Sequence, residues 1–409
     1  MKRRQLLRQG ALASATGLLS VGMHGWALRS PAGAAQPADA TPRLVVIFLR
    51  GAADGLNIVV PYQEPYYYEA RPFLAIAPPE KDNGALDLDG QFGLHPALAP
   101  LVPHWQAGNL AFVHACGSPV VTRSHFQAQD NMETAAPGES SIRNGWLNRL
   151  IAFLPEGTPT RAVSIAGATP LIFTGEQFVT SIAAGRSGSR RLPIDNERIQ
   201  SAFDQLYSGQ DRLSQMYQEA RMARNILSEA LNGEDEGASR NAPAPGQFLG
   251  SIQHLTRLMK GDAATQVAFM ELGKWDTHVN QPNPFKANLS DLAAGLDALA
   301  TGLGPIYNRT AIVVMSEFGR TVRQNGNGGT DHGHGNVMWL MGGAIRGGRM
   351  YGQWPGLAPE QLHENRDLAV TTDFRDVLGS LLVQHFGLND EAIAQVFPGY
   401  ELQQSLQLV

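Results

Sequence analysis

The chain has 409 residues, of which 43% are hydrophobic and 17% are charged, and its formal net charge is -5. This length and composition suffice for one large domain or two ordinary ones, and the excess of acidic groups argues against a nucleic-acid partner. The only cysteine, Cys116, excludes an intramolecular disulfide, so burial of apolar side chains must stabilise the fold.

The amino terminus has the layout of an export signal. Arg3 and Arg4 precede a moderately apolar stretch at about residues 11–28, and the small residues 32–35 follow it. Paired arginines in this position are typical of proteins that the twin-arginine translocase exports in the folded state, although an ordinary basic helix start looks similar. We therefore expect residues 1–35 to be a signal peptide, residues 36–42 to be a spacer, and the mature protein to be periplasmic or secreted.

The rest of the sequence alternates between buried strands and helices. Residues 44–49 are continuously apolar, which is typical of a parallel strand covered on both faces. Further strands are predicted at residues 109–116, 161–166, 266–272, 311–315 and 336–341. No run approaches the roughly 18 apolar residues of a membrane span, so we expect none after signal removal.

Helices are predicted between these strands. Apolar spacing of three and four predicts helices at residues 288–303 and 372–385, with Gly387 as the last stop signal. Further helical segments are predicted at residues 95–105, 126–134 and 248–259, of which 126–134 is polar. The alternation favours a doubly wound, mostly parallel α/β sheet flanked by helices over residues 43–409. A polar helical stretch followed by an acidic, Gly- and Pro-rich segment predicts an inserted helical cap at about residues 195–246.

Three predicted strands are followed closely by an acidic residue: Asp54, Asp276 and Glu317. Because the carboxyl ends of parallel strands meet at one edge of a sheet, we expect these side chains to lie close together. Each also has a plainer interpretation. Asp54 fits a turn, Asp276 fits a helix cap, and Glu317 fits an ion pair with Arg320 or Arg323.

Histidines accompany these acids. His278 lies two residues after Asp276, and a Gly-flanked loop before the last predicted strand contains Asp331, His332 and His334. Carboxylates gathered at one edge repel one another unless a cation lies between them, and oxygen with imidazole ligands suits Zn²⁺, Mn²⁺ or a similar divalent ion. We therefore predict a site for one or two divalent metal ions, built from these loops.

The residues after the second predicted strand are candidates for catalysis. Ser124 stands at the start of a predicted helix, where it is either a helix cap or a nucleophile that faces the positive end of the helix dipole. Arg123 is a candidate for offsetting negative charge on a substrate. His125 is a candidate metal ligand or acid/base.

Five motifs in order along the mature chain resemble those of the uncharacterised DUF1501 family. They are Arg50-Gly51-Ala52-Ala53-Asp54-Gly55-Leu56-Asn57, Ser124-His125-Phe126, Trp275-Asp276-Thr277-His278, Ser316-Glu317-Phe318-Gly319-Arg320-Thr321 and Gly329-Thr330-Asp331-His332-Gly333-His334-Gly335. That family usually carries a twin-arginine signal. It is similar to the alkaline phosphatase/sulfatase superfamily, so the resemblance implies an alkaline-phosphatase-like fold and metal-dependent hydrolysis of phosphate or sulfate esters.

The resemblance also implies roles for individual residues. Asp54 would bridge to a second metal, and Ser124 would be near the position of the nucleophile. Asp276 and His278 would bind the first metal. His334 would be the last histidine ligand, with His332 as its nearest competitor.

Two departures from the superfamily pattern narrow these expectations. Glu317 and Phe318 stand where the superfamily usually has Asp-His-Gly, so a second metal is missing or differently held. Cys116-Gly117-Ser118-Pro119 lacks the Cys-x-Pro-x-Arg arrangement that sulfatases convert to formylglycine, which argues against a sulfatase of the usual kind.

The sequence therefore predicts an exported metal-dependent hydrolase of phosphate or related esters, with an anionic small molecule or polymer as substrate. The alternative is a non-catalytic periplasmic binding or assembly protein that retains the fold and a partial metal site. The run Tyr66-Tyr67-Tyr68 is typical of packing, and it is also a candidate pocket wall.

Overall fold

The computed structural model describes residues 41–139, 141–155, 157–166, 169–182, 197–231, 247–261 and 265–409. The predicted signal peptide, most of the predicted spacer and residues 195–196 and 232–246 of the predicted insertion lie outside the described residues. Pro42–Val409 forms the compact unit considered below.

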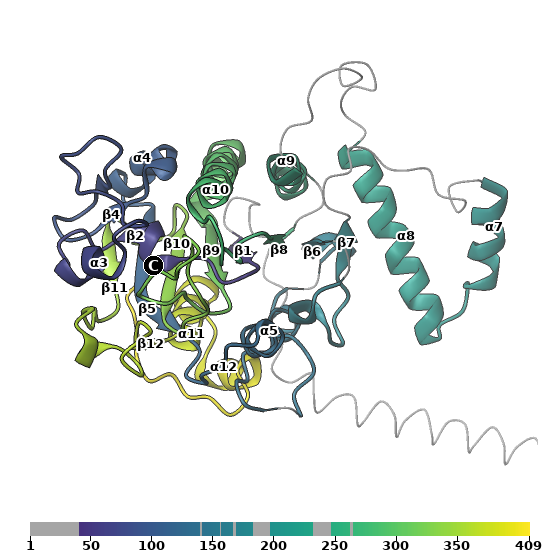
Figure 1. Cartoon of the computed structure of the whole chain (residues 1–409). Coiled ribbons are helices and arrows are strands. Elements are labelled where there is room, and N and C mark those ends of the chain that lie inside the picture. The colour runs from purple at the N-terminus through teal and green to yellow at the C-terminus, as the bar shows by residue number, and fades with distance from the viewer. Residues whose placement is uncertain are drawn as a thin grey trace, which may run out of the picture. The chain divides into compact units, whose positions relative to one another are not determined.

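A large sheet forms the centre of this unit, and nine of its strands fall within the described residues (Figure 1). The strand order is β11 (Arg349–Tyr351), β5 (Leu110–Gly117), β10 (Asn336–Met341), β9 (Thr310–Ser316), β1 (Arg43–Leu49), β8 (Val267–Leu272), β6 (Ala162–Ile165) and β7 (Thr180–Ile182), with β12 (Thr372–Asp373) paired to β5. All pairings are parallel except those of β10, which runs against β5 and β9. The predicted mostly parallel sheet is confirmed.

The apolar run of β1 explains its position in the middle of the sheet. Leu44 pairs with Val267 of β8 and with Ala311 of β9, and every residue of the strand is buried. Alternate side chains enter two separate cores, with Val46 on one face and Ile47 on the other. A strand without polar alternation therefore lies where both of its faces are covered.

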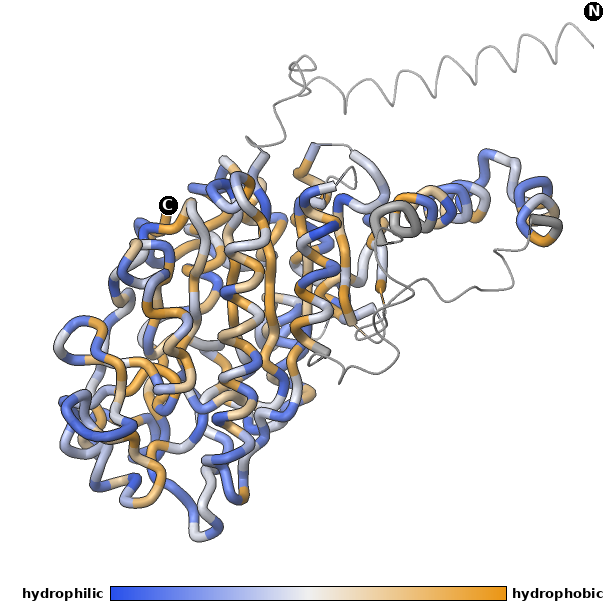
Figure 2. Tube along the Cα trace, turned by 90° about the horizontal axis from the view of Figure 1, so that it is seen from above, coloured by the Kyte–Doolittle hydropathy of each residue, from blue (hydrophilic) through white to orange (hydrophobic). Residues whose placement is uncertain are grey.

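Helices cover both faces of the sheet, as the α/β prediction requires (Figure 1). One face carries η2 (Pro96–Leu101), α4 (Val102–Gln106), α9 (Gln247–Lys260) and α10 (Pro282–Leu303). The other carries α5 (His125–Thr134), α6 (Trp146–Ile151), α11 (Phe374–Phe386) and α12 (Asp390–Val396). Figure 2 shows the apolar residues concentrated along the strands and the inner sides of these helices.

Two predicted helices differ from expectation in instructive ways. The single helix predicted at residues 95–105 is split into η2 and α4, because Pro100 lies inside it and cannot donate a main-chain hydrogen bond. The helix predicted from residue 372 begins at Phe374 as α11, since Asp373 accepts a cap hydrogen bond from the Arg375 amide. Gly387 ends α11 in the left-handed conformation, as predicted.

Smaller elements complete the described structure. A three-stranded sheet contains β2 (Val59–Val60), β4 (Gly93–Leu94) and β3 (Leu86–Asp87), near α2 (Gly55–Ile58) and α3 (Pro65–Ala70). Within the predicted insertion the structure describes α7 (Glu197–Leu206) and α8 (Arg212–Leu231); α8 contacts α9 and η3 (Pro159–Arg161). The limits of the insertion stay a prediction. None of the described helices combines the length and the hydrophobicity that a membrane crossing needs.

The antiparallel direction of β10 determines where the functional loops meet. β1, β5, β8 and β9 end at one edge of the sheet, and β10 begins there, because Asn336 pairs with Cys116 near the end of β5. The loop of residues 317–335 leaves β9 and enters β10 at this same edge. Its histidines therefore lie beside the loops that follow the parallel strands, although they precede a strand.

Candidate metal centre

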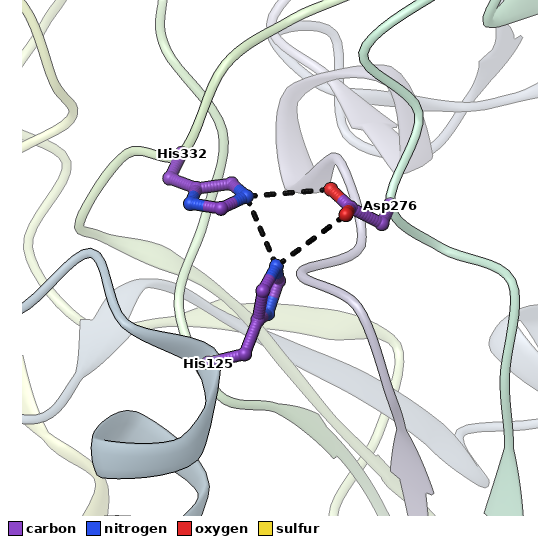
Figure 3. Close-up of side chains that lie close together, drawn as sticks. All are labelled: His125, Asp276 and His332. Atoms are coloured by element: carbon purple, nitrogen blue, oxygen red, sulfur yellow. Dashed lines mark hydrogen bonds and ion pairs between the residues drawn. The ribbon is translucent and has the colours of Figure 1, made fainter.

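Three side chains from distant parts of the sequence meet at this edge: His125, Asp276 and His332 (Figure 3). The Nε2 atoms of His125 and His332 lie 2.9 Å apart. The Asp276 carboxylate lies 3.6 Å from His125 Nε2 and 3.3 Å from His332 Nε2. The Asp276 side chain is 46% exposed, so the group is open to solvent and to a ligand.

His278 extends the group. Its Nε2 lies 2.9 Å from the Asp276 carboxylate and 2.9 Å from His332 Nε2. Three imidazoles and one carboxylate therefore gather within the described part of this edge. They come from α5, from the loop after β8 and from the loop before β10.

Close backbone packing allows these loops to approach one another. Gly51, just after β1, has a φ of +114°, and a Cβ atom there would lie 2.7 Å from the backbone nitrogen of Asp276. Only glycine fits this position without moving one of the two loops. The glycine in the Arg50-Gly51 motif thus places Asp276 next to the end of β1.

The other ring nitrogen of each histidine contacts an atom that only accepts hydrogen bonds. The Nδ1 atom of His125 lies 2.8 Å from the Glu317 carboxylate, and that of His278 lies 3.0 Å from the Asp331 carboxylate. The Nδ1 atom of His332 lies 2.9 Å from the carbonyl oxygen of Arg123. Each Nδ1 is therefore the donor, which leaves a lone pair on every Nε2 of the neutral rings.

The converging Nε2 lone pairs need positive charge between them, because two neutral acceptors 2.9 Å apart repel each other. A proton or a metal ion supplies it. A tetrahedral Zn²⁺ with bonds of about 2.0–2.1 Å holds neighbouring ligand atoms about 3.3 Å apart, which is close to the separations observed here. Histidines that donate their second nitrogen to a carboxylate or a carbonyl are typical of metal sites. The residues present thus fit a divalent ion.

Glu317 supports His125 from the interior. Its Oε1 atom accepts hydrogen bonds from His125, from the Gly51 amide at 2.9 Å and from Gln129 Nε2 at 2.9 Å. Burial alone would raise the pKa of Glu317, but the hydrogen bonds from His125 and Gln129 lower it below its ordinary value. The hydrogen bond to this carboxylate in turn raises the pKa of His125. Glu317 therefore orients a ligand and is not itself in the ligand group.

Asp331 supports His278 as Glu317 supports His125, by accepting a hydrogen bond from its Nδ1 atom. Its Oδ1 atom also accepts a hydrogen bond from Asn325 Nδ2 at 3.2 Å. Burial raises the pKa of Asp331, and the bonds from Asn325 and His278 outweigh that effect, so the net shift is downward. The charged carboxylate is thus available to hold the His278 ring.

Arg320 fixes Asp276, a role that the sequence did not predict. Its fully buried guanidinium donates to Asp276 Oδ1 at 2.6 Å and to four main-chain carbonyls, those of Gly51, Ala52, Trp275 and Thr330. The pKa of Asp276, which burial alone would raise, is lowered by the bond and the charge of Arg320. One arginine therefore joins the loops after β1 and β8 to the loop before β10.

Phe318 lies where the superfamily pattern has a histidine, and it provides an apolar wall. Its ring centroid is 5.0 Å from that of His125 and 5.1 Å from that of His332. It packs with Ala52 and Ala128 in a small buried cluster. This contact explains why a phenylalanine fits the position, and it supplies no ligand for a second metal.

Asp54 lies outside the ligand group. Its fully buried carboxylate forms a two-pronged ion pair with Arg71, at 2.7 and 3.0 Å, and accepts a hydrogen bond from Gln281 Nε2 at 2.6 Å. The Gln281 Oε1 atom in turn accepts from Thr277 and Thr330, on the two loops that carry His278 and His332. Asp54 thus braces the loops. No sequence pattern indicated Arg71 as its partner, because Arg71 lies 17 residues away at the end of a separate helix.

His334 also lies outside the group. It is buried, its ring stands 4.9 Å from that of His363, and burial together with the neighbouring His363 lowers its pKa to about 4. Its carbonyl accepts a hydrogen bond from the Gly319 amide. Of the two histidines in this loop, the structure brings His332 to Asp276.

The three candidate catalytic residues are neighbours of the group. Ser124 is exposed and occupies the cap position of α5, but its hydroxyl makes no cap hydrogen bond. His125, the first residue of α5, is a member of the ligand group. The Arg123 guanidinium lies 2.7 Å from Glu364 and 3.1 Å from Asp367, so its positive charge is already paired.

Fold and site together define an α/β protein with a cluster of metal-ligand side chains beyond the carboxyl ends of its strands. The chain belongs to the family described as "Protein of unknown function (DUF1501)", whose model matches residues 41–397. This confirms the predicted family. No curated protein matches the chain.

Two of the solved structures that match the chain are distantly similar to it. The crystal structure of Ps i-CgsB in complex with k-i-k-neocarrahexaose has a TM-score of 0.36 and 11% identity, over 87% of this chain and 74% of that chain. The crystal structure of the PsFucS1 sulfatase from Pseudoalteromonas sp. has a TM-score of 0.33 and 11% identity, over 86% and 68%. Likeness at this level assigns neither a reaction nor a substrate.

Proposed function

We propose that this chain is a metal-dependent hydrolase of phosphate or related esters. One observation carries the proposal: three histidines, each with its Nδ1 held by an acceptor, direct their Nε2 atoms toward one another and toward Asp276. His125, Asp276 and His332 would hold the ion, with His278 beside them. The site is at the end of the sheet where open α/β proteins bind ligands.

A divalent ion in such a site supplies Lewis acidity, which polarises an ester oxygen and lowers the pKa of a hydroxyl or a water. The protein residues supply the rest of the environment. Glu317 and Asp331 keep their histidines oriented, and Arg320 keeps Asp276 ionised. Ser124, next to His125 and without a cap hydrogen bond, is the candidate nucleophile.

We further propose export of the folded protein through the twin-arginine translocase, to the periplasm or beyond. The support is the pair Arg3 and Arg4, together with a single, buried cysteine that requires no oxidising compartment. A site built from residues 125, 276 and 332 forms only when the chain has folded. Metal-loaded precursor in the cytoplasm is the expected observation, and a precursor that stays metal-free until export would contradict it.

An ester panel tests the proposed hydrolase. Purified exported protein is incubated with phosphate monoesters, phosphodiesters and sulfate esters in the presence of Zn²⁺, Mn²⁺ or Mg²⁺. We expect turnover that depends on the ion and is abolished in Asp276→Asn and His332→Ala. Asp291→Asn, at an exposed carboxylate on α10, is the matched control and should retain activity. Activity that ignores both site variants would refute the proposal.

The pairing of Arg123 with Glu364 and Asp367 supports one alternative, a non-catalytic binding or assembly protein with a metal site. Under this alternative the protein binds the ion with the same residues but turns over none of the esters. Turnover that disappears in Ser124→Ala while metal binding persists would exclude it.

A further inference from the structure

A cavity of about 430 Å³ adjoins the metal centre. Its walls come from α3, from the first part of the 317–335 loop and from the segment before β12. Its lining residues include Tyr66, Arg323, Asp331, Leu357, Leu362 and Arg366. This size is within the range of small-molecule sites.

Asp331 connects the cavity to the metal centre. The residue lines the cavity, and its Oδ1 atom accepts the hydrogen bond from His278 Nδ1 at 3.0 Å. His278 Nε2 lies 2.9 Å from Asp276. A ligand in the cavity is therefore separated from the candidate ligand group by the side chains of Asp331 and His278.

The cavity wall is held in place without a ligand. The Arg71 guanidinium donates to the carbonyl oxygens of Thr321 and Val322, both at 2.9 Å. Gln324 Oε1 accepts from the Phe73 and Leu74 amides at 2.9 and 3.0 Å. These bonds join the 317–335 loop to the segment after α3, so both sides of the cavity are already in position.

Two guanidinium groups on the cavity wall, those of Arg323 and Arg366, can donate hydrogen bonds to an anionic ligand. Arg323 is exposed, and its side chain has no hydrogen-bond or ion-pair partner within the described ranges. Arg366 contacts Asp367 through Nη1 alone, at 3.0 Å from each carboxylate oxygen. Guanidinium donors match the planar edge of a carboxylate or the oxygens of a phosphate or sulfate.

Some of the other lining residues are aromatic or apolar and can pack against a ring of a ligand. Tyr66 on α3 is 39% exposed, and Leu357 and Leu362 supply apolar contact on the segment before β12. Aromatic and apolar side chains with a few placed polar groups are typical of sites for ring-bearing ligands. Two acidic residues, Glu69 and Asp331, also line the cavity, and Asp331 accepts a hydrogen bond from His278. The positive charges of Arg323 and Arg366 balance their two negative charges.

The backbone on this side of the cavity is strained. Glu364 and Asn365 are consecutive non-glycine residues with a φ of 53° each. Such residues persist only where the surroundings hold them, and they cluster at ligand-binding sites. Here the left-handed pair immediately precedes Arg366, whose main chain is held by hydrogen bonds to Val322 and His363.

We propose that the cavity binds a ring of the substrate that carries a second anionic group, a sulfate, a phosphate or a carboxylate. Arg323 and Arg366 bind that group, and Tyr66 packs against the ring. The inference rests on the proposed function, in which the metal centre holds the ester to be cleaved. It names the substrate class as an ester whose ring bears an additional negative charge.

Calorimetric titration of the full exported chain with 2-naphthalenesulfonate tests the proposal. The protein is first treated with a chelator, so that binding to a metal ion does not contribute. We expect Arg323→Met to weaken binding about tenfold, since this change removes one charge-assisted hydrogen bond to the sulfonate. The neutral 2-naphthalenesulfonamide should bind about tenfold more weakly than the sulfonate to the unmodified protein, and Arg323→Met should not weaken it further.

Two further variants locate the bound anion. Arg349→Met removes an exposed arginine on β11, away from the cavity, and should leave the sulfonate affinity unchanged. His332→Ala should also leave it unchanged. Equal affinities in Arg323→Met and in unmodified protein would overturn the inference, and so would loss of binding in His332→Ala. Sulfonate binding without ester turnover would contradict the proposed hydrolase but would still support an anion site in the cavity.

Discussion

Replacement of Glu317 by glutamine tests whether the carboxylate behind His125 controls metal affinity. The amide fits the site. Its oxygen can keep the three hydrogen bonds from Gly51, His125 and Gln129, while its NH₂ group can donate to Ser316 Oγ, which then donates to the Leu49 carbonyl. The change therefore removes one negative charge with little change of shape.

The size of the expected effect follows from the hydrogen bond between this carboxylate and the His125 ring. The carboxylate accepts from His125 at 2.8 Å and increases the basicity of that ring. Mutation of such a supporting partner typically weakens metal binding about 10- to 100-fold, or about 1.4–2.7 kcal/mol. Zn²⁺ affinity is measured by competition with a chromophoric chelator at about pH 7.

The control variant is Asp376→Asn on α11. It also removes a buried carboxylate, one that accepts hydrogen bonds from Tyr400 Oη and the Gln403 amide, but it lies outside the ligand group. We expect its Zn²⁺ affinity to match that of the unmodified protein. A folded Glu317→Gln protein with unchanged Zn²⁺ affinity would show that the negative charge of Glu317 does not strengthen metal binding through His125.

Three other predictions concern stability. Arg320→Met leaves four carbonyls and Asp276 without their donor, so the free energy of unfolding in urea should fall by about 3–5 kcal/mol; a fall below about 1 kcal/mol would contradict this role. Zn²⁺ at about 100 times its Kd should raise that free energy by about 2.7 kcal/mol, and His332→Ala should abolish the gain. Burial lowers the pKa of His114 to about 3, so the unfolded chain binds a proton that the folded chain excludes. Between about pH 7 and pH 5 the protein should lose about 2 kcal/mol through this group, and His114→Phe should remove that part of the loss.

The sequence predicted the parts of the fold that depend on local pattern. The strand pattern identified β1, β5, β6, β8, β9 and β10 to within a residue or two, and apolar spacing identified α10 and α11. Helix α9 was also predicted. Strands β7, β11 and β12 were not predicted. They have two or three residues each, too few for a pattern to emerge.

The sequence predicted which loops form the candidate site more accurately than it predicted which side chains in them are ligands. His125, Asp276, His278 and His332 meet as strand-end geometry suggested, whereas Asp54 and His334 do not join them. Spacing along the chain carries no information on which of two nearby histidines turns toward a carboxylate. That choice follows from the contacts around His332, whose Nδ1 hydrogen is bound by a carbonyl of a residue 209 positions earlier.

The sequence analysis did not predict the roles of two buried arginines. Arg71 and Arg320 are fully buried, and each binds main-chain carbonyls far away in the sequence. Such partners belong to no local motif, since any residue offers a carbonyl. The plainer interpretation of the sequence paired Glu317 with Arg320 or Arg323, but the structure pairs Arg320 with Asp276.

The central position of β1 has a consequence for the timing of folding. Leu44 is among the first residues of the unit Pro42–Val409 to leave the ribosome, but its partners are Val267 and Ala311. At a synthesis rate of about 5–20 residues per second, the strand waits roughly 10–45 s before β8 has been made. During that time an apolar segment with two unpaired edges is exposed to other chains. Contacts so distant in sequence also slow folding after synthesis, so the nascent chain should depend on chaperones until its carboxyl-terminal half emerges.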